Sequence, residues 1–202
     1  MFTGLFEPAF LQAACAHVEP IPPTPPEPDG IVIRTNVNGD IEPLLSCTGS
    51  ITIKRIYEGV EHTDSYTDLN QTATEMPADA DTDIVITGKV TYLATAPMVS
   101  NKITSIRALN SSLQELTIGT QNSLTTLCLP TTLTSFSNAG LTGVTKIMYP
   151  ANNNSVSTAI KNAITNATAA DGVVYLDEDG DYYDTIANAA TAKGWTIEQL
   201  PA

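Results

Sequence analysis

The sequence has little positive charge, few cysteines and no long apolar run. Nine Lys and Arg residues stand against 22 Asp and Glu, so the formal net charge is −13. Such a chain repels nucleic-acid phosphates and anionic membrane surfaces, and no cluster of basic residues offsets this repulsion. No apolar stretch is long enough to span a bilayer. We therefore expect neither nucleic acid nor a membrane among its partners.

Cysteine is represented by Cys15, Cys47 and Cys128 alone. No C-x-x-C pair occurs, so the sequence indicates neither a zinc site nor a thioredoxin-like site. Three scattered cysteines are typical of reduced thiols or core fillers rather than of a disulfide framework. This interpretation fits assembly in a reducing cytoplasm.

Groups suited to catalysis are scarce. His17 and His62 lie in segments of different type, and neither has a nearby Ser or Cys constellation that would make a triad. The sequence contains no P-loop, no G-x-G-x-x-G and no carboxylate pair in a recognisable glycosidase context. We expect no catalytic residue, no cofactor and no enzyme activity. A hydrolase with an unrecognised site is kept as the third hypothesis.

Four acidic residues, Asp177, Glu178, Asp179 and Asp181, surround Gly180. Carboxylate oxygens suit a hard cation such as calcium. The EF-hand spacing and its closing Glu are absent, however, and we expect strands on both sides. The sequence therefore predicts a hairpin turn, with a weak calcium site as the alternative, and we expect no metal centre.

Residues 1–18 form an apolar leader, and residues 19–30 form a linker with six prolines. Prolines in this number favour an extended polyproline II spacer. The leader is too short for a stable isolated helix, so we predict an anchor that docks on a partner; a disordered tail is the alternative. The predicted docking side chains are Phe2, Leu5, Phe6, Phe10 and Leu11.

A secretion signal is not expected at the start of the chain. Ala13-Ala14-Cys15 is similar to a lipoprotein cleavage site, but no Lys or Arg occurs before Arg34. Glu7 and Pro8 also interrupt the apolar run.

Residues 31–88 are predicted to form a small antiparallel β-module. The stretches 31–37 and 50–59 alternate apolar and polar residues with period two. Turns are expected at 38–40 and 48–50, each of which contains a glycine. The polar, acidic stretch 61–81 is expected to be the longest connection and to run over the surface.

Residues 89–150 carry an L-x-x-L-x-L pattern in short Thr-rich blocks, which indicates a β-solenoid rather than helices. Each coil would bury the apolar row of the next, and the alternate threonines Thr117, Thr125, Thr126, Thr134 and Thr145 would face outwards or stack in ladders. The apolar positions are Val90, Leu93, Ile103, Ile106, Leu113, Leu116, Ile118, Leu124, Leu127, Leu129, Leu133, Phe136, Val144, Ile147 and Tyr149.

Residues 151–202 are predicted to cap this array. Val156, Ile160 and Ile164 form one apolar stripe of a helix over about 155–169, with Asn154 or Ser155 as N-cap. A strand at 172–177, a second helix at 184–194 and a final strand at 195–200 should follow. Asp184 is the expected N-cap of the second helix, Gly194 its C-terminal glycine, and Trp195 the cover of the open end.

The blocks SLTTLCLP and GVTKIMYP end in the same residue, at Pro130 and Pro150. Their spacing of about 20 residues lies within the span of leucine-rich coils. The region from Ser123 to Pro150 resembles the BspA-type leucine-rich repeat family of Bacteroides-type bacteria and their phages, and residues 82–118 and 171–200 are similar to its lead-in and end-module. The resemblance covers about half the chain. It implies a mainly β fold with an α+β C-terminal cap, and the array is shorter than is typical of the family.

The order of anchor, spacer and β-modules leads to the first functional hypothesis, a phage head fibre, tail fibre or capsid decoration on the virion surface, made in the host cytoplasm. Its expected partners are a capsid or other virion protein through residues 1–18, further copies of itself (a trimer favoured over a dimer), and a host glycan or envelope protein. The alternative is a secreted or lipid-anchored adhesin on the bacterial cell surface.

Overall fold

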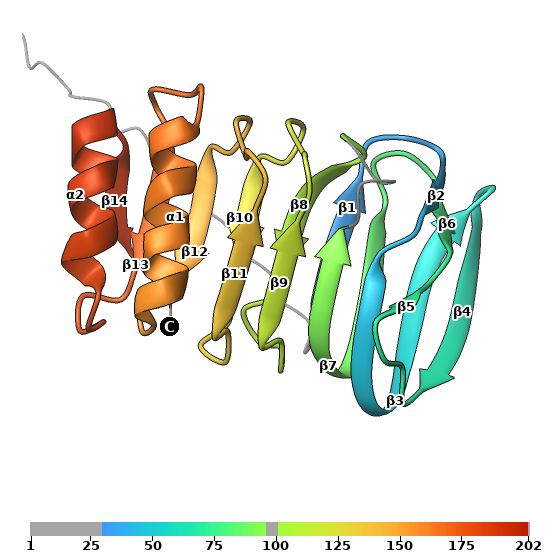
Figure 1. Ribbon diagram of the computed structural model, residues 1–202. Helices are drawn as coiled ribbons and strands as arrows, with labels where there is room; N and C mark the ends of the chain where they lie inside the picture. Colours follow the sequence, from blue (N-terminus) through green and yellow to red (C-terminus); the bar gives the residue numbers. More distant parts are fainter. Residues whose placement is uncertain (1–29, 96–100, 202) are drawn as a thin grey trace, which may run out of the picture.

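The computed structural model describes residues 30–95 and 101–201, and this part of the chain is mainly β, as the sequence predicts. One large mixed sheet and a small two-stranded sheet hold the strands, and two helices lie towards the C-terminal end (Figure 1). The predicted anchor at 1–18 and all of the linker except Gly30 lie outside the described residues.

The first half of the chain is antiparallel. β3 pairs with β4 on one side and with β7 on the other, and β1 pairs with β7. β2 and β6 form the separate two-stranded sheet. The strands are β1 (Ile31–Thr35), β2 (Gly39–Ile41), β3 (Leu44–Tyr57), β4 (Val60–Thr67), β5 (Thr72–Ala73), β6 (Met76–Ala78) and β7 (Asp83–Thr95).

The polar stretch 61–81 is exposed over most of its first half, but Thr74, Met76 and Ala78 are buried, and the prediction that the stretch is a connection is wrong. It contains most of β4 and all of β5 and β6. A turn at Glu58 and Gly59 joins β3 to β4, and the Asp79 carboxylate accepts hydrogen bonds from both backbone nitrogens, at 3.0 and 2.8 Å. Cross-strand backbone pairing holds β4 although it has few apolar side chains, and period-two hydrophobicity could not reveal it.

Both predicted turns of the β-module are displaced. Thr48-Gly49-Ser50 lies inside β3, where the pairing with β7 shifts register between Cys47 and Ile51. Gly49 has φ +73, so the glycine permits a bulge in a continuous strand rather than a chain reversal. The other bend lies at 36–38, and Gly39 already belongs to β2.

The predicted boundary between residues 88 and 89 falls inside β7. β1 also links the segments on the two sides of this boundary, because it pairs antiparallel with β7 on one edge and with β8 (Ile103–Arg107) on the other. The segments 31–88 and 89–150 therefore share one hydrogen-bonded sheet.

Two rows of parallel strands follow, as two layers of an elongated body (Figure 1). The back layer continues from β8 through β10 (Thr126–Cys128), β12 (Lys146–Tyr149), β13 (Val173–Leu176) and β14 (Thr196–Gln199). The front layer runs from the end of β7 through β9 (Glu115–Ile118) to β11 (Ser135–Asn138). The chain alternates between the two layers. From β9 on, each strand therefore pairs with the strand that lies two elements earlier in the chain, helices included.

The register repeats at an almost constant interval along the chain. Ile106, Leu127 and Ile147 are directly paired in the back layer, and Leu116 and Phe136 are directly paired in the front layer. The predicted apolar positions from Val90 to Tyr149 are all at most 6% exposed, which confirms the predicted core. Burying one such side chain stabilises the fold by roughly 1.5–3 kcal/mol.

The predicted threonine ladder is present between successive back-layer strands. The Thr125 backbone nitrogen and hydroxyl both donate to the Thr104 carbonyl, at 2.9 and 3.1 Å. Thr145 repeats this arrangement on the Thr125 carbonyl, at 2.9 and 3.4 Å. These bonds satisfy backbone carbonyls at or just before the start of the back-layer strands.

Two helices replace strands in the front layer after β12. α1 (Asn154–Asn166) buries Val156, Ile160 and Ile164, as predicted. Its N-cap is Asn153, one residue before the expected position; its side chain accepts from the Val156 nitrogen at 3.2 Å.

α2 (Tyr183–Lys193) ends at Gly194, which has the predicted left-handed conformation. The prediction for its start is wrong. The N-cap is Tyr182, and Asp184 lies in the first turn.

Trp195 is buried, but it does not cover the end of the sheet. Its ring packs directly over Gly172, where an added Cβ would lie 2.3 Å from the indole, and its Nε1 donates to the Ala169 carbonyl at 3.0 Å. β14 is the last strand in the sheet order. Within the described part of the chain, neither helix has the length and apolarity needed to cross a membrane.

Candidate functional site

The predicted docking residues Phe2, Leu5, Phe6, Phe10 and Leu11 lie outside the described residues, as does His17. Cys47 and Cys128 are buried and form no disulfide. His62 is on β4, where its ring lies 6.2 Å from that of Tyr57 in a tilted arrangement. In the ranges 30–95 and 101–201, no three or more His, Cys, Asp or Glu side chains form a group that could hold a metal ion.

The acidic segment 177–181 is not a hairpin turn. It connects β13 to α2, and β13 pairs in parallel with β14 instead. Asp177 holds the turn together: its carboxylate accepts from the Asp179 nitrogen at 3.1 Å and its carbonyl accepts from the Gly180 nitrogen at 3.0 Å. An added Cβ at Gly180 would lie 2.5 Å from the Pro150 carbonyl oxygen. These residues stabilise the chain reversal, and the calcium alternative has no support here.

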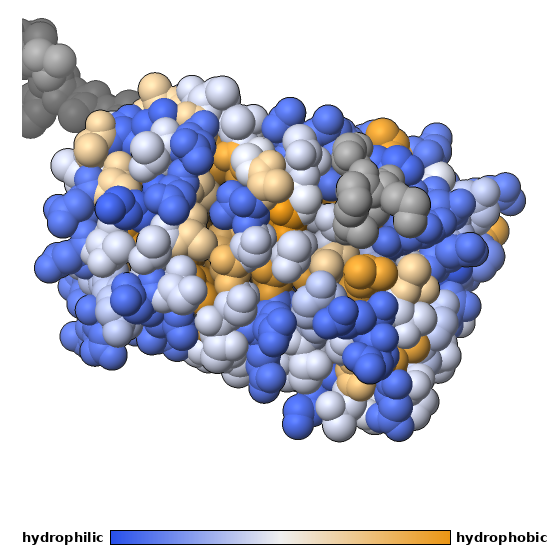
Figure 2. Space-filling view, viewed as in Figure 1, coloured by the Kyte–Doolittle hydropathy of each residue, from blue (hydrophilic) through white to orange (hydrophobic). Residues whose placement is uncertain are grey.

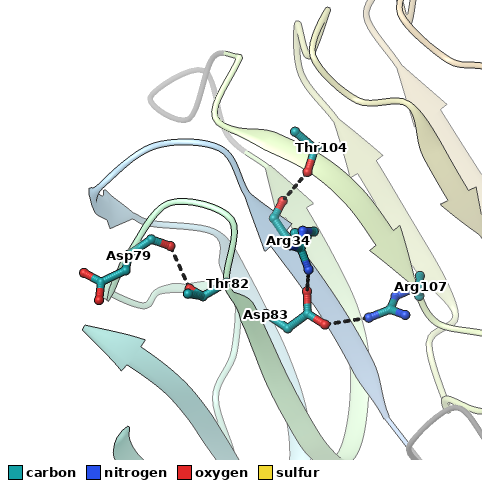
Figure 3. Close-up of polar contacts among 6 residues, drawn as sticks. All are labelled: Arg34, Asp79, Thr82, Asp83, Thr104 and Arg107. Carbon is teal, nitrogen blue, oxygen red and sulfur yellow. Dashed lines mark hydrogen bonds and ion pairs between the residues drawn. The ribbon is translucent and has the colours of Figure 1, made fainter. Parts of the chain in front are cut away.

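An ion cluster joins three neighbouring strands (Figure 3). The Asp83 carboxylate of β7 binds Arg34 of β1 at 3.2 Å and Arg107 of β8 at 2.8 Å. The Thr104 hydroxyl donates to the Arg34 carbonyl at 3.3 Å. All three charged side chains are partly exposed, so each pair stabilises the fold by about 1 kcal/mol or less. The cluster binds the antiparallel half to the parallel half, and one carboxylate between two guanidinium groups leaves excess positive charge.

Sequence reasoning missed this cluster because its members are far apart in the chain. Arg34 and Asp83 are direct partners in the β1–β7 register, and Arg107 lies on the other side of β1. The register of β1 between β7 and β8 was the missing information.

The tip of the β3–β4 hairpin exposes two apolar side chains. Ile56 is 41% exposed and Val60 is 57% exposed, and they flank the turn at Glu58 and Gly59. Tyr57 and His62 lie beside them. These side chains form a small apolar and aromatic surface beside a turn that Asp79 holds.

The front face carries two shallow grooves, of which the one between β11 and α1 has the more polar lining. One, of about 450 Å³, lies between α1 and α2; its lining is more apolar than polar, although Lys161, Asp184 and Lys193 border it. The other, of about 410 Å³, lies between β11 and α1. Figure 2 shows this side: the surface over the helices is mainly hydrophilic, with orange atoms gathered near the middle of the view. The groove between β11 and α1 offers hydrogen-bond donors and acceptors, among them Asn138 and Asn162, to a polar ligand such as a sugar.

Three tyrosines have raised pKa values. Burial raises the pKa of Tyr149 to about 12. The pKa of Tyr57 is raised first by the charge of Glu58, and that of Tyr175 first by desolvation and then by Glu198. Each shift favours the neutral phenol near pH 7, so none of the three supplies a reactive phenolate at that pH.

No family model, no curated protein and no solved structure matches the chain.

Proposed function

We propose that residues 89–150 form a short leucine-rich β-solenoid, with residues 151–202 as its α/β cap. The register supports this proposal, because Ile106, Leu127 and Ile147 stack directly and follow one another at an almost constant interval. α1 and α2 would continue the coils with helices in place of front-layer strands, while β13 and β14 extend the back layer. Stacked coils of this kind form a rigid body whose units contact their immediate neighbours.

We propose that the protein is a structural component of a phage virion: a head fibre, a tail fibre or a capsid decoration. The observation that carries the proposal is the elongated stack of paired parallel strands, which would serve as a rigid display element (Figure 1). The apolar leader at 1–18 would anchor it on a virion protein. The polar groove between β11 and α1 and the hairpin tip at Ile56 and Val60 would contact host glycans or an envelope protein.

Co-sedimentation with purified virions tests the anchor. Full-length protein with Phe2, Phe6 and Phe10 each changed to Ser should lose at least about tenfold in retention, because burial of each aromatic side chain is worth roughly 1.5–3 kcal/mol. Val60→Ser is the matched control, since it removes an exposed apolar side chain outside the leader. Equal retention of the triple variant and the control would refute anchoring by residues 1–18.

The adhesin alternative makes a different prediction about the N-terminus. Lipid attachment at Cys15 after cleavage is expected for a surface adhesin, whereas an intact N-terminal segment is expected for the virion protein. Mass spectrometry of protein from its native source distinguishes them.

The proposed assembly is a symmetric homo-oligomer, with a trimer favoured over a dimer. Light scattering coupled to size-exclusion chromatography measures the mass directly. A mass of one chain at the concentrations found in particles would refute self-association.

A further inference from the structure

The back layer has a second row of side chains, on the face opposite the core. Within each back-layer strand the neighbours of the inward residues point outwards, because side chains alternate along a strand. The register pairs Val32 with Arg107, Arg107 with Cys128, Cys128 with Met148, and Met148 with Tyr175. We call these five residues the outer row. Strands β1, β10 and β12 thus place the apolar side chains of Val32, Cys128 and Met148 on the face away from the core.

The apolar members of the outer row are shielded from solvent. Val32 is 3% exposed, Cys128 1% and Met148 9%. Both helices lie in the other layer, with β9 and β11, so neither covers this face (Figure 1). Apolar side chains on an uncovered sheet face would be expected to be far more exposed.

Basic side chains flank the outer row. Arg107 belongs to it, and Arg34 lies on β1 beside Asp83. Lys146, at the outward position next to Met148 in β12, lies 5.1 Å from the centre of the Tyr175 ring. Asp83, which binds both arginines, and Glu198, the register partner of Tyr175, lie on the same face, so these three cations leave an excess of one positive charge, which attracts an acidic partner.

The linker at 19–29 has the matching chemistry. It contains six prolines, the acids Glu19, Glu27 and Asp29, and no basic residue. It joins β1 through Gly30, where an added Cβ would lie 2.2 Å from the Ile86 carbonyl oxygen. Proline-rich segments dock readily on apolar and aromatic surfaces because their extended conformation is already restricted.

The linker is also long enough. From Val32 to Tyr175 the outer row crosses four inter-strand steps of about 4.8 Å, about 19 Å in all. At about 3.1 Å per residue, an extended polyproline II segment of the length of residues 19–29 would span about 34 Å. Cys128 lies two strands from β1, about 10 Å, which corresponds to about three residues before Gly30. Glu27 would therefore lie near Arg107 and Cys128.

We propose that the outer row is the docking site of the linker, residues 19–29 of the same chain. The linker is then part of the folded body rather than a free stalk, and it delivers residues 1–18 to the β13–β14 end of the sheet. This proposal stands on the sheet register and on charge, and it holds whether or not the chain is a virion protein.

Cys128 reports on the docking directly. In the full-length protein, alkylation of Cys128 by iodoacetamide, followed by peptide mass spectrometry, should be slow. Replacing residues 19–29 by a Gly-Ser sequence of equal length should accelerate it by roughly tenfold or more. Cys47, buried in β3, is the internal control and should keep its rate. An unchanged Cys128 rate in the replaced chain would overturn the proposal; equal acceleration of both cysteines would also count against it, because it signals general unfolding.

A second experiment leaves the linker otherwise native. Glu27→Cys should form a disulfide with Cys128 under mild oxidation, whereas Glu19→Cys should not, because it lies about 25 Å further along the linker. Both variants remove one carboxylate from the same segment, so they are matched. Equal cross-linking of the two variants, or none in either, would overturn the docking.

Discussion

Removing one side chain from the middle of the back-layer core row should destabilise the whole stack. Leu127 is fully buried and is paired with Ile106 on one side and Ile147 on the other. Leu127→Ala deletes its apolar atoms and leaves a cavity between two layers that are fixed by backbone pairing. The expected loss is about 2–5 kcal/mol in the free energy of unfolding, towards the upper part of that range because paired strands on both sides hinder collapse.

Thr126→Ala is the matched control, since it lies one residue earlier on the same strand and its side chain points to the other face. Its expected effect is within about 0.5 kcal/mol. Urea unfolding followed by Trp195 fluorescence and by far-ultraviolet circular dichroism measures both variants. Trp195 is the single tryptophan and is buried near β14, so its emission reports on the C-terminal end of the stack.

With a slope of about 2 kcal/mol per molar urea, a loss of about 3 kcal/mol lowers the midpoint by about 1.5 M for Leu127→Ala. Agreement of the two probes shows that the loss spreads along the stack rather than staying in one coil. A shift for Leu127→Ala no larger than that for Thr126→Ala would refute the stacked core.

Three further substitutions test separate contacts. Gly143→Ala should cost about 1–3 kcal/mol in thermal or urea unfolding, because its Cβ would lie 1.9 Å from the Asn122 carbonyl oxygen of the preceding coil; a neutral result would contradict that close approach. Asn153→Ala should cost about 1 kcal/mol by loss of the α1 N-cap, and an unchanged stability would remove the assigned cap. Burial raises the pKa of Tyr149 to about 12, above the value of about 10 expected in the unfolded chain. The contribution of the neutral Tyr149 phenol to the free energy of unfolding is therefore complete below about pH 10 and is lost as pH rises from about 10 to about 12. Tyr149→Phe should abolish this alkaline loss of stability, measured by urea unfolding at a series of pH values.

The apolar core was predictable because its signal is local. Leu124, Leu127 and Leu129 repeat a spacing that recurs in each short block of the array, and burial follows it closely. The stripe of α1 and the glycine that ends α2 also have local causes: a helical period and a left-handed backbone conformation at Gly194.

Long-range pairing was not predictable from local patterns. β1 inserts between β7 and β8, which joins distant parts of the chain and places both Arg34 and Arg107 on Asp83. The sequence does not predict β4, because its residues are mainly polar and lack the alternating apolar pattern of a strand; backbone pairing with β3 holds it in place. A turn was predicted at Gly49 because a bulge and a turn both require a residue with positive φ, which glycine adopts readily.

Among the candidate functional surfaces, one was predicted from the sequence and two depend on the three-dimensional strand register. The docking residues at 1–18 remain a sequence prediction, while the hairpin tip at Ile56 and Val60 depends on the β3–β4 register and emerges only in three dimensions. The outer row likewise needs the register of five strands, since Val32 and Tyr175 have no sequence relation to each other.

The most direct test is the pattern of cross-strand nuclear Overhauser effects among backbone protons of the isotope-labelled full-length protein. Stacked parallel coils predict that Leu127 shows such contacts to both Ile106 and Ile147, and that Leu116 shows them to Phe136. Helical contacts between residues three and four apart across 113–129, or antiparallel pairing of β10 with β12, would contradict the stack and the display function proposed for it.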